Sequence, residues 1–141
     1  MQISFGSMPS HLKDHVHFGI NYQSFNDEVD DGECTSIYGI NILDYVPEYD
    51  LDKFLDSLVK KMRHKCELVL GGSDVYETAK CLLRGDFTAR TINQELYGNK
   101  DTSKLGQYSL NMISMGLAQR GLKIQDKQID GTTMYVKAIR E

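Results

Sequence analysis

The sequence predicts an α/β fold, in which one mostly parallel sheet has helices on both faces and ends in an antiparallel hairpin. Three observations predict it. Residues 36–70 read as a buried strand, an amphipathic helix and a second apolar strand, the pattern of a parallel strand–helix–strand unit. Strand-like and helix-like segments also alternate along the chain. Finally, Asp130-Gly131 separates two alternating runs, which is a strong hairpin signal.

Two short strands are expected near the N-terminus, at Gln2–Phe5 and His15–Ile20. The turn-forming cluster Gly6–Ser10 ends the first strand, and the short gap that follows leaves room for one helical turn at most. The polar and acidic segment Asn21–Glu33 is predicted to be a loop, and Ser36–Ile42 is predicted to be the next strand.

The helix predicted after Pro47 has apolar residues at three- and four-residue spacing, and Asp50 or Asp52 can cap it. Glu67–Leu70 is predicted to be a central strand because its apolar residues are consecutive. Asp74 then caps the first of three predicted helices, which span Val75–Arg84, Ala89–Leu96 and Lys104–Arg120. The hairpin follows, with strands over Leu122–Lys127 and Thr133–Ile139.

The composition fits one domain over residues 1–141, with 40% apolar and 26% charged residues. A net charge of −4 gives no strong signal for nucleic-acid binding. The basic run from Lys60 to Lys65 is explained by the end of a helix, where cationic residues favour the helix dipole. No apolar run is long enough for a membrane span, and the N-terminus lacks the features of a signal peptide.

The three cysteines are widely spaced and form no Cys-x-x-Cys pair, so neither a zinc knuckle nor a redox dithiol is indicated. Free thiols suggest a reducing compartment, and we expect a complete cytoplasmic domain. His15 and His17 share a strand face, but no third ligand is set by spacing, so no metal site is expected.

Ligands of mostly parallel sheets bind beyond the carboxyl ends of the strands. Four segments are expected to meet there, and any site should be built from them: Gly6–Ser10, Ile20–Tyr22, Asn41–Tyr45 and Gly71–Asp74.

The whole chain resembles the compact class I (Rossmann-fold) S-adenosylmethionine-dependent methyltransferases, which are found in bacterial and phage sugar- and nucleotide-modification contexts. Ile3–Pro9 is similar to the family's opening strand and its Gly-Ser/Cys-Gly-Pro turn. Ile37–Val46 is similar to the fourth strand and its Leu-Glu-His loop, and Leu68–Asp74 to the fifth strand and the aspartate after it. The closing hairpin supplies the family's reversed strand.

The resemblance implies S-adenosylmethionine as cofactor, held by a degenerate motif. Met8 stands where a second glycine is usual, and Gly19 where an acid normally accepts hydrogen bonds from the ribose; Asn21 can still bond a hydroxyl there. The acidic pair Asp30-Asp31 stands near the expected adenine position, although such loops are often only solvated. The cofactor-binding candidates are Gly6, Ser7, Met8, Gly19, Asn21, Asp30, Asp31 and Asn41.

Asp44 and Tyr45 are the catalytic candidates, because with Asn41 they stand near the expected sulfonium position. Each also has a structural interpretation: Asp44 as a helix cap near Pro47, Tyr45 as a rim aromatic and Asn41 as a turn residue.

Two functions remain open. One is methyl transfer to a sugar, nucleotide or other small polar acceptor, with Thr88–Ser103 as a lid. The other is a non-catalytic binding or assembly module. A homodimer through the open sheet edge of the terminal hairpin is a further expectation.

Overall fold

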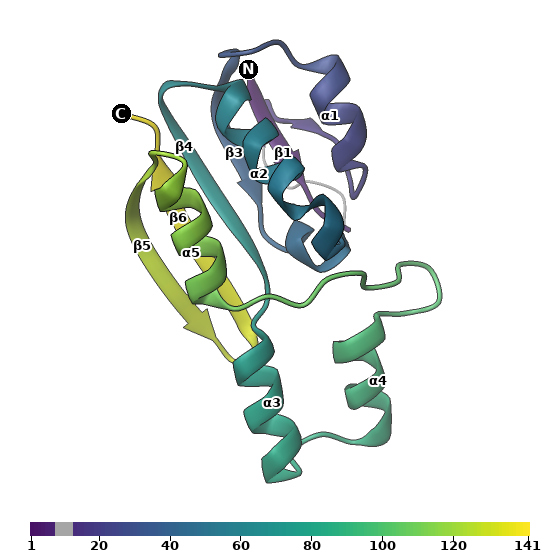
Figure 1. Cartoon of the computed structure of the whole chain (residues 1–141). Helices are drawn as coiled ribbons and strands as arrows, with labels where there is room; N and C mark the ends of the chain where they lie inside the picture. Colours follow the sequence, from purple (N-terminus) through teal and green to yellow (C-terminus); the bar gives the residue numbers. More distant parts are fainter. Residues whose placement is uncertain (8–12) are drawn as a thin grey trace.

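The computed structural model describes residues 1–7 and 13–141, which form one six-stranded sheet in the order β2-β1-β3-β4-β6-β5 (Figure 1). Strands β2, β1, β3 and β4 are parallel neighbours, whereas β6 runs antiparallel to both β4 and β5. The predicted mostly parallel sheet with a closing hairpin is therefore confirmed. The strands are β1 (Gln2–Phe5), β2 (Val16–His17), β3 (Cys34–Gly39), β4 (Met62–Ser73), β5 (Lys123–Asp130) and β6 (Thr133–Ile139).

The helical segments of the described residues differ from the predicted ones in three places, one of which is a 3-10 turn that includes Ile42, predicted as the last residue of a strand. They are α1 (Tyr22–Glu28), the 3-10 turn η1 (Ile42–Tyr45), α2 (Glu48–Lys61), α3 (Val75–Arg84), α4 (Ala89–Tyr97) and α5 (Leu110–Gln119). Helix α1 lies in the predicted loop, where the Asn21 side chain caps it and Phe25 anchors it in the core. Helix α5 begins six residues later than predicted, at Leu110, because the preceding segment runs extended against η1.

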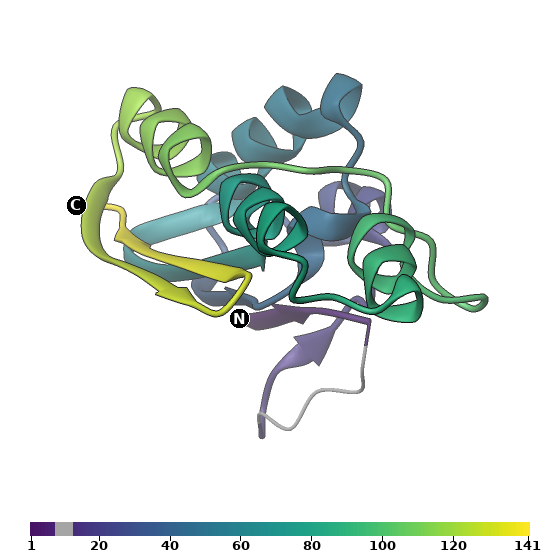
Figure 2. The ribbon, with the colours of Figure 1, turned by 90° about the horizontal axis from the view of Figure 1, so that it is seen from below.

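The helices cover one face of the sheet instead of the two that were predicted. Residues of adjacent strands that share a face, such as Ile3, Ile37 and Leu68, are at most 1% exposed and pack against α1, α2 and α5. On the opposite face, Tyr38 and Val69 are only half-buried. In Figure 2, α2 and α5 lie above the strands, and no described helix lies below them.

The handedness of the connections explains this one-sided cover. The segments that carry α1, α2 and α5 all cross the sheet in the same direction, and right-handed crossovers in one direction place their helices on one face. Among the connections between parallel strands, only the one from β1 to β2 runs the other way. It consists of residues 6–15, which is shorter than the dozen or so residues that a helical crossover needs.

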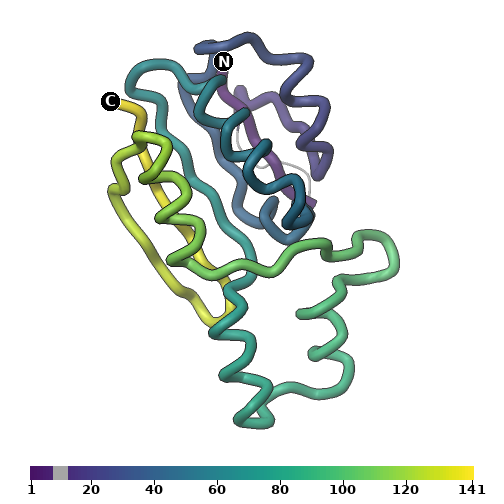
Figure 3. The backbone as a smooth tube through the Cα atoms, viewed as in Figure 1, coloured from purple at the N-terminus to yellow at the C-terminus, as the bar shows by residue number. Residues whose placement is uncertain are grey.

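Helices α3 and α4 project beyond the carboxyl end of β4, and we call residues 75–103 the arm. Figure 3 follows the backbone out of β4, through both helices and back to α5. The Asp74 carboxylate links the start of α3 to the start of α5. Its Oδ1 accepts hydrogen bonds from the backbone N–H groups of Tyr76 and Glu77, and its Oδ2 accepts one from the backbone N–H of Leu110. Among the described residues, no helix has the length and apolar character that crossing a bilayer requires.

Candidate functional site

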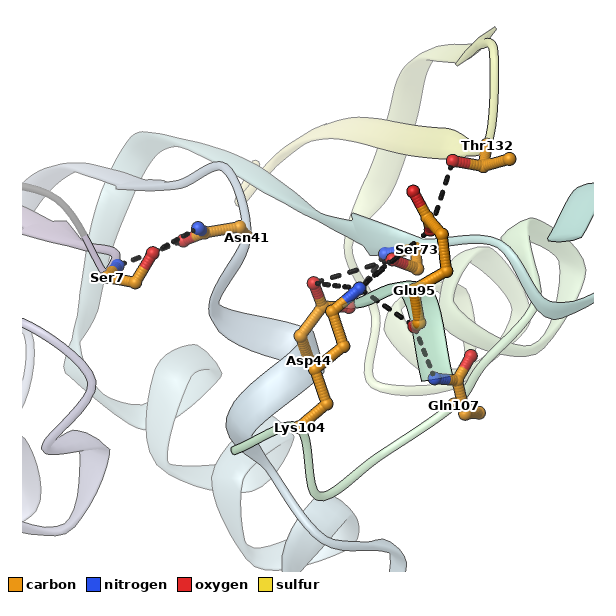
Figure 4. Close-up of polar contacts among 8 residues, drawn as sticks. All are labelled: Ser7, Asn41, Asp44, Ser73, Glu95, Lys104, Gln107 and Thr132. Atoms are coloured by element: carbon orange, nitrogen blue, oxygen red, sulfur yellow. Dashed lines mark hydrogen bonds and ion pairs between the residues drawn. The ribbon is translucent and has the colours of Figure 1, made fainter. Parts of the chain in front are cut away.

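Two corners that lie far apart in the sequence meet at the carboxyl edge of the sheet. The Ser7 backbone N–H donates to Asn41 Oδ1 at 3.3 Å, and Asn41 Nδ2 donates to Ser7 Oγ at 2.8 Å (Figure 4). The Gly6 N–H donates to the Gly19 carbonyl at 2.9 Å. These four residues, Gly6, Ser7, Gly19 and Asn41, join the ends of β1, β2 and β3, and we call them the rim.

The rim combines small residues with exposed apolar neighbours. Gly6 and Gly19 have φ angles of 153° and 61°, in the region that glycine adopts most readily. A Cβ added to Gly19 would meet no atom of residues 1–7 and 13–141 within 4 Å, so these residues leave open space beside the backbone. Ile20 and Ile40, the neighbours of Gly19 and Asn41, are each 37% exposed. The edge therefore offers backbone that a ligand can approach closely and apolar surface beside it.

The other predicted cofactor-binding residues are placed differently. The Asn21 Oδ1 accepts from the Ser24 N–H at 3.3 Å, as the N-cap of α1. Asp30 and Asp31 precede β3, so they lie at the opposite edge of the sheet and are not brought to the rim. There the Lys61 ammonium donates to Asp31 at 3.0 Å, and this hydrogen bond holds the pKa of the Asp31 carboxyl below its usual value. Met8 lies outside the described residues.

Asp44 and Tyr45, the catalytic candidates, are both 7% exposed. The Ser73 N–H donates to Asp44 Oδ1 at 2.8 Å, and Lys104 Nζ lies 3.6 Å from Asp44 Oδ2. A Cβ on Gly72 would lie 3.0 Å from Asp44 Oδ1, so the glycine permits this close approach. The Asp44 carboxylate thus holds η1, the end of β4 and the segment after the arm together.

Lys104 is the residue that the sequence analysis missed, because it fell inside a predicted helix. Its ammonium donates to Ser73 Oγ at 2.9 Å and to the Glu95 carbonyl at 3.0 Å (Figure 4). The Glu95 carboxylate in turn accepts from Thr132 Oγ1 at 3.3 Å. We call Asp44, Ser73, Glu95, Lys104 and Thr132 the Lys104 cluster. It fixes the arm to η1, to β4 and to the β5–β6 turn.

Comparison with known proteins identifies the fold. No family model matches the chain, and neither does any curated protein. Solved structures do match. The chain superposes on a SAM-dependent methyltransferase from Methanosarcina mazei with a TM-score of 0.62 at 10% identity, over 94% of this chain and 72% of that one. The chain has the class I methyltransferase fold.

Two further methyltransferase structures agree with this assignment. A SAM-dependent methyltransferase from Aquifex aeolicus gives a TM-score of 0.57 at 11% identity, over 100% of this chain and 82% of that one. A SAM-dependent methyltransferase from Archaeoglobus fulgidus gives a TM-score of 0.59 at 10% identity, over 89% of this chain and 67% of that one. This chain therefore spans between two thirds and about four fifths of their lengths. The predicted Rossmann-like methyltransferase fold is confirmed in its sheet and closing hairpin, whereas the predicted helices on both faces are not.

Proposed function

We propose that this chain binds S-adenosylmethionine at the rim and transfers its methyl group to a polar acceptor: a sugar, a nucleotide or another small molecule. The hydrogen-bonded pair Ser7–Asn41 carries the proposal, because with the Gly6–Gly19 bond it gathers three strand ends at one edge. In open α/β sheets, ligands bind outside the carboxyl ends of the strands. The methyltransferase fold of the chain supports this choice of ligand.

The residues at the rim fit the cofactor in shape and donor chemistry. Gly6 has no side chain, and the described residues leave open space at Gly19, so the methionine part and the ribose can lie against the backbone there. The exposed side chains of Ile20 and Ile40 suit a flat ring such as adenine. The polar groups of Ser7 and Asn41 are neutral, so their hydrogen bonds are weaker than those that a carboxylate makes. We therefore expect weaker binding than an acidic residue at Gly19 would give.

The bound cofactor would supply an activated methyl group on a sulfonium. The chain's own contribution is then to hold cofactor and acceptor in line and to exclude water, which can account for much of a rate enhancement. Lys104 and Asp44 act here as positioning residues, since they fix the η1 turn that directly follows Asn41. A base is needed only where the acceptor is a poor nucleophile.

Isothermal titration calorimetry with S-adenosylmethionine and with its demethylated product tests the proposal. Gly19→Asp should tighten binding about tenfold, equivalent to about 1.4 kcal/mol, because it adds charge-assisted hydrogen bonds to the ribose. Gly32→Asp is the matched control: Gly32 has a similar φ of 69° and equally open space, but it lies at the other edge of the sheet. Wild-type protein that gives no binding heat at millimolar ligand contradicts the proposal.

Methyl transfer is measured separately, as release of the demethylated product in the presence of sugars, nucleotides or small hydroxylated acceptors. Transfer above the rate without acceptor supports the enzymatic function and identifies the acceptor class. Binding of the cofactor without any transfer to these three classes contradicts the proposed acceptor chemistry while leaving the cofactor site intact.

A non-catalytic binding or assembly module is the second candidate. The observation in its favour is that Asp44 is buried and paired with Lys104, while the end of β2 carries Gly19 in place of an acid. This candidate predicts no binding heat for the wild type. It also predicts that Met8→Gly combined with Gly19→Asp restores binding. Failure of the double variant to bind contradicts the idea that a cofactor site was lost by these two changes.

A further inference from the structure

Helices α1 and α2 lie side by side on the covered face of the sheet, and a cavity of about 180 Å³ opens between them (Figure 1). Its walls come from both helices, and we call it the α1–α2 cavity: Tyr22, Gln23 and Asn26 from α1, and Asp50, Lys53, Phe54 and Ser57 from α2. None of these residues belongs to the rim or to the Lys104 cluster. The volume is below the roughly 300–1,000 Å³ of sites for drug-sized molecules, so a ligand that fills the cavity is small.

Two hydrogen bonds between the helices frame the cavity. The Tyr22 hydroxyl donates to Asp50 Oδ2 at 2.6 Å, and Ser57 Oγ donates to Asn26 Oδ1 at 3.2 Å. Phe54 lies between these two bonds along α2. It is 3% exposed and packs edge-on against the Tyr22 ring, with 5.3 Å between the ring centroids. The cavity therefore has an aromatic wall whose orientation is fixed by packing.

The Asp50 carboxylate keeps one oxygen for a ligand. Burial and the hydrogen bond to Asp50 raise the pKa of the Tyr22 phenol, so the hydroxyl stays protonated and donates to the carboxylate. This bond occupies Oδ2 only. Within residues 1–7 and 13–141, no donor is bonded to Asp50 Oδ1, and the side chain is half-buried. A charged oxygen in this position is a strong acceptor for an ammonium group.

Lys53 brings a positive charge to the same wall without neutralising Asp50. The two residues are three positions apart on α2, a spacing at which acidic and basic side chains are neighbours on a helix. Glu77 and Lys80 have this spacing on α3 and pair at 3.0 Å. Asp50 and Lys53, both in the described part of the chain, form no such pair, and both line the cavity. The cavity thus has a separate negative group and a separate positive group.

These two charges select against a ligand of a single sign. An amine would be attracted by Asp50 and repelled by Lys53, and a carboxylate or phosphate would meet the reverse. An α-amino acid carries its ammonium and its carboxylate on one carbon atom. It can therefore pair with both side chains at once through charge-assisted hydrogen bonds. The amides of Gln23 and Asn26 and the aromatic wall remain available for the rest of the ligand.

We propose that the α1–α2 cavity binds a small zwitterion of the α-amino acid class, with the ligand's ammonium on Asp50 and its carboxylate on Lys53. The site is separate from the rim, and the inference does not depend on cofactor binding. Lys53 is exposed and Asp50 is half-buried, so water partly screens both charges. We therefore expect weak binding, with a dissociation constant on the order of 1 mM.

Ligand-observed NMR tests the proposal on the full chain, with each of the standard L-amino acids as a separate probe at about 10 mM. At least one amino acid should give saturation-transfer signals, and its dissociation constant is then measured by titration. Its N-acetyl derivative and its α-carboxamide each lack one of the two charges, so both should bind roughly tenfold more weakly. No signal from any amino acid contradicts the proposal. So does equal binding of the parent compound and its two derivatives.

Two charge variants connect the binding to the cavity. Asp50→Asn and Lys53→Met should each weaken binding of the parent amino acid roughly tenfold. The asparagine side chain keeps an oxygen that accepts from the Tyr22 hydroxyl, so the frame of the cavity is retained. Asp52→Asn and Lys60→Met are the matched controls on the same helix, because these side chains are 91% and 67% exposed outside the cavity. Circular dichroism verifies that all four variants fold. Losses no larger than in the controls overturn the assignment.

S-adenosylmethionine itself contains an α-amino acid group, so a competition experiment separates the cavity from the rim. The saturation-transfer signals of the bound amino acid should persist when S-adenosylmethionine is added, because the two sites share no residue. Displacement of the amino acid by S-adenosylmethionine would place both ligands at one site and contradict the proposal.

Discussion

Lys104 Nζ lies 3.6 Å from Asp44 Oδ2, and the two side chains are only 12% and 9% exposed. Removing the cation leaves a buried carboxylate without its charge partner. Lys104→Met should therefore lower the free energy of unfolding by about 3 kcal/mol, measured by urea denaturation. Lys80→Met is the control, because the Lys80–Glu77 pair is surface-exposed and should be worth less than about 1 kcal/mol. Equal losses in the two variants would show that the buried pair has no special role.

Asp74 caps α3 and also binds the first N–H of α5, whose own N-cap is Ser109. It accepts from Tyr76 and Glu77 at the start of α3 at 2.9 and 3.0 Å, and from Leu110 at the start of α5 at 2.8 Å. Asp74→Ala should cost about 2–3 kcal/mol in thermal or urea unfolding, because the cap of α3 and the hydrogen bond from Leu110 are lost together. Thr88 caps α4 alone, so Thr88→Ala should cost about 1 kcal/mol. A loss in Asp74→Ala no larger than in Thr88→Ala would contradict this double role of Asp74.

The three thiols should differ in reactivity. Burial raises the pKa of Cys34 to about 11 and that of Cys66 to about 12, and both side chains are in the core. Cys81 is half-buried, and Arg84 Nη2 lies 3.4 Å from its sulfur. With Ellman's reagent at about pH 8, the native protein should show one fast thiol, and the protein in urea should show all three. Cys81→Ser should abolish the fast phase; a fast phase that persists would assign it to a core thiol.

The Asp31–Lys61 hydrogen bond makes the free energy of unfolding depend on pH in the acid range. Because the folded-state pKa of Asp31 lies below its ordinary value of 3.8, the folded protein binds fewer protons than the unfolded chain in this range. The stabilisation is complete above the unfolded pKa and is lost as pH falls through the folded pKa. The difference in unfolding free energy between wild type and Asp31→Asn should thus be largest near neutral pH and vanish in strong acid. A difference that does not change with pH would rule out this ionisation as its source.

Asn41 joins the two corners of the rim through both groups of its amide. Asn41→Ala should lower the unfolding free energy by about 1 kcal/mol and, under the proposed function, weaken S-adenosylmethionine binding about tenfold in calorimetry. Asn99→Ala is the control, because Asn99 accepts hydrogen bonds from Asp101 and Thr102 in the arm. It should cost similar stability without changing the affinity. Equal affinity in both variants would place the ligand elsewhere.

Local patterns in the sequence were sufficient for most of the fold. The strand–helix–strand unit from β3 to β4 and the hairpin at Asp130-Gly131 could be predicted because their apolar spacing and turn residues are specified within a few neighbours. Helix α1 could not be predicted, because Phe25 is its one buried residue and the residues around it are mostly polar. The extended run before α5 was missed because tertiary hydrogen bonds to the Asp44 carbonyl outweigh its helical pattern.

The positions of the rim residues could be predicted where they follow from the direction of the parallel strands. Gly6 and Asn41 each follow a parallel strand, so their meeting at one edge follows from the fold class. Asp30 and Asp31 precede a strand and are carried to the other edge for the same reason. The Lys104 cluster was not predictable, because it joins side chains from η1, β4, α4 and the β5–β6 turn, whose proximity exists only in the folded chain.

The position of Asp74, which binds the starts of both α3 and α5, has a consequence for how this chain can vary in length. The excursion between Val75 and Ser109 leaves and re-enters the molecule at one carboxylate, so its ends are already adjacent whatever lies between them. Closing a loop costs little more when the loop is longer, by only about 0.6 kcal/mol for each doubling. Insertions or a transplanted segment at the tip of the arm, between α3 and α4, would leave the register of the six strands untouched.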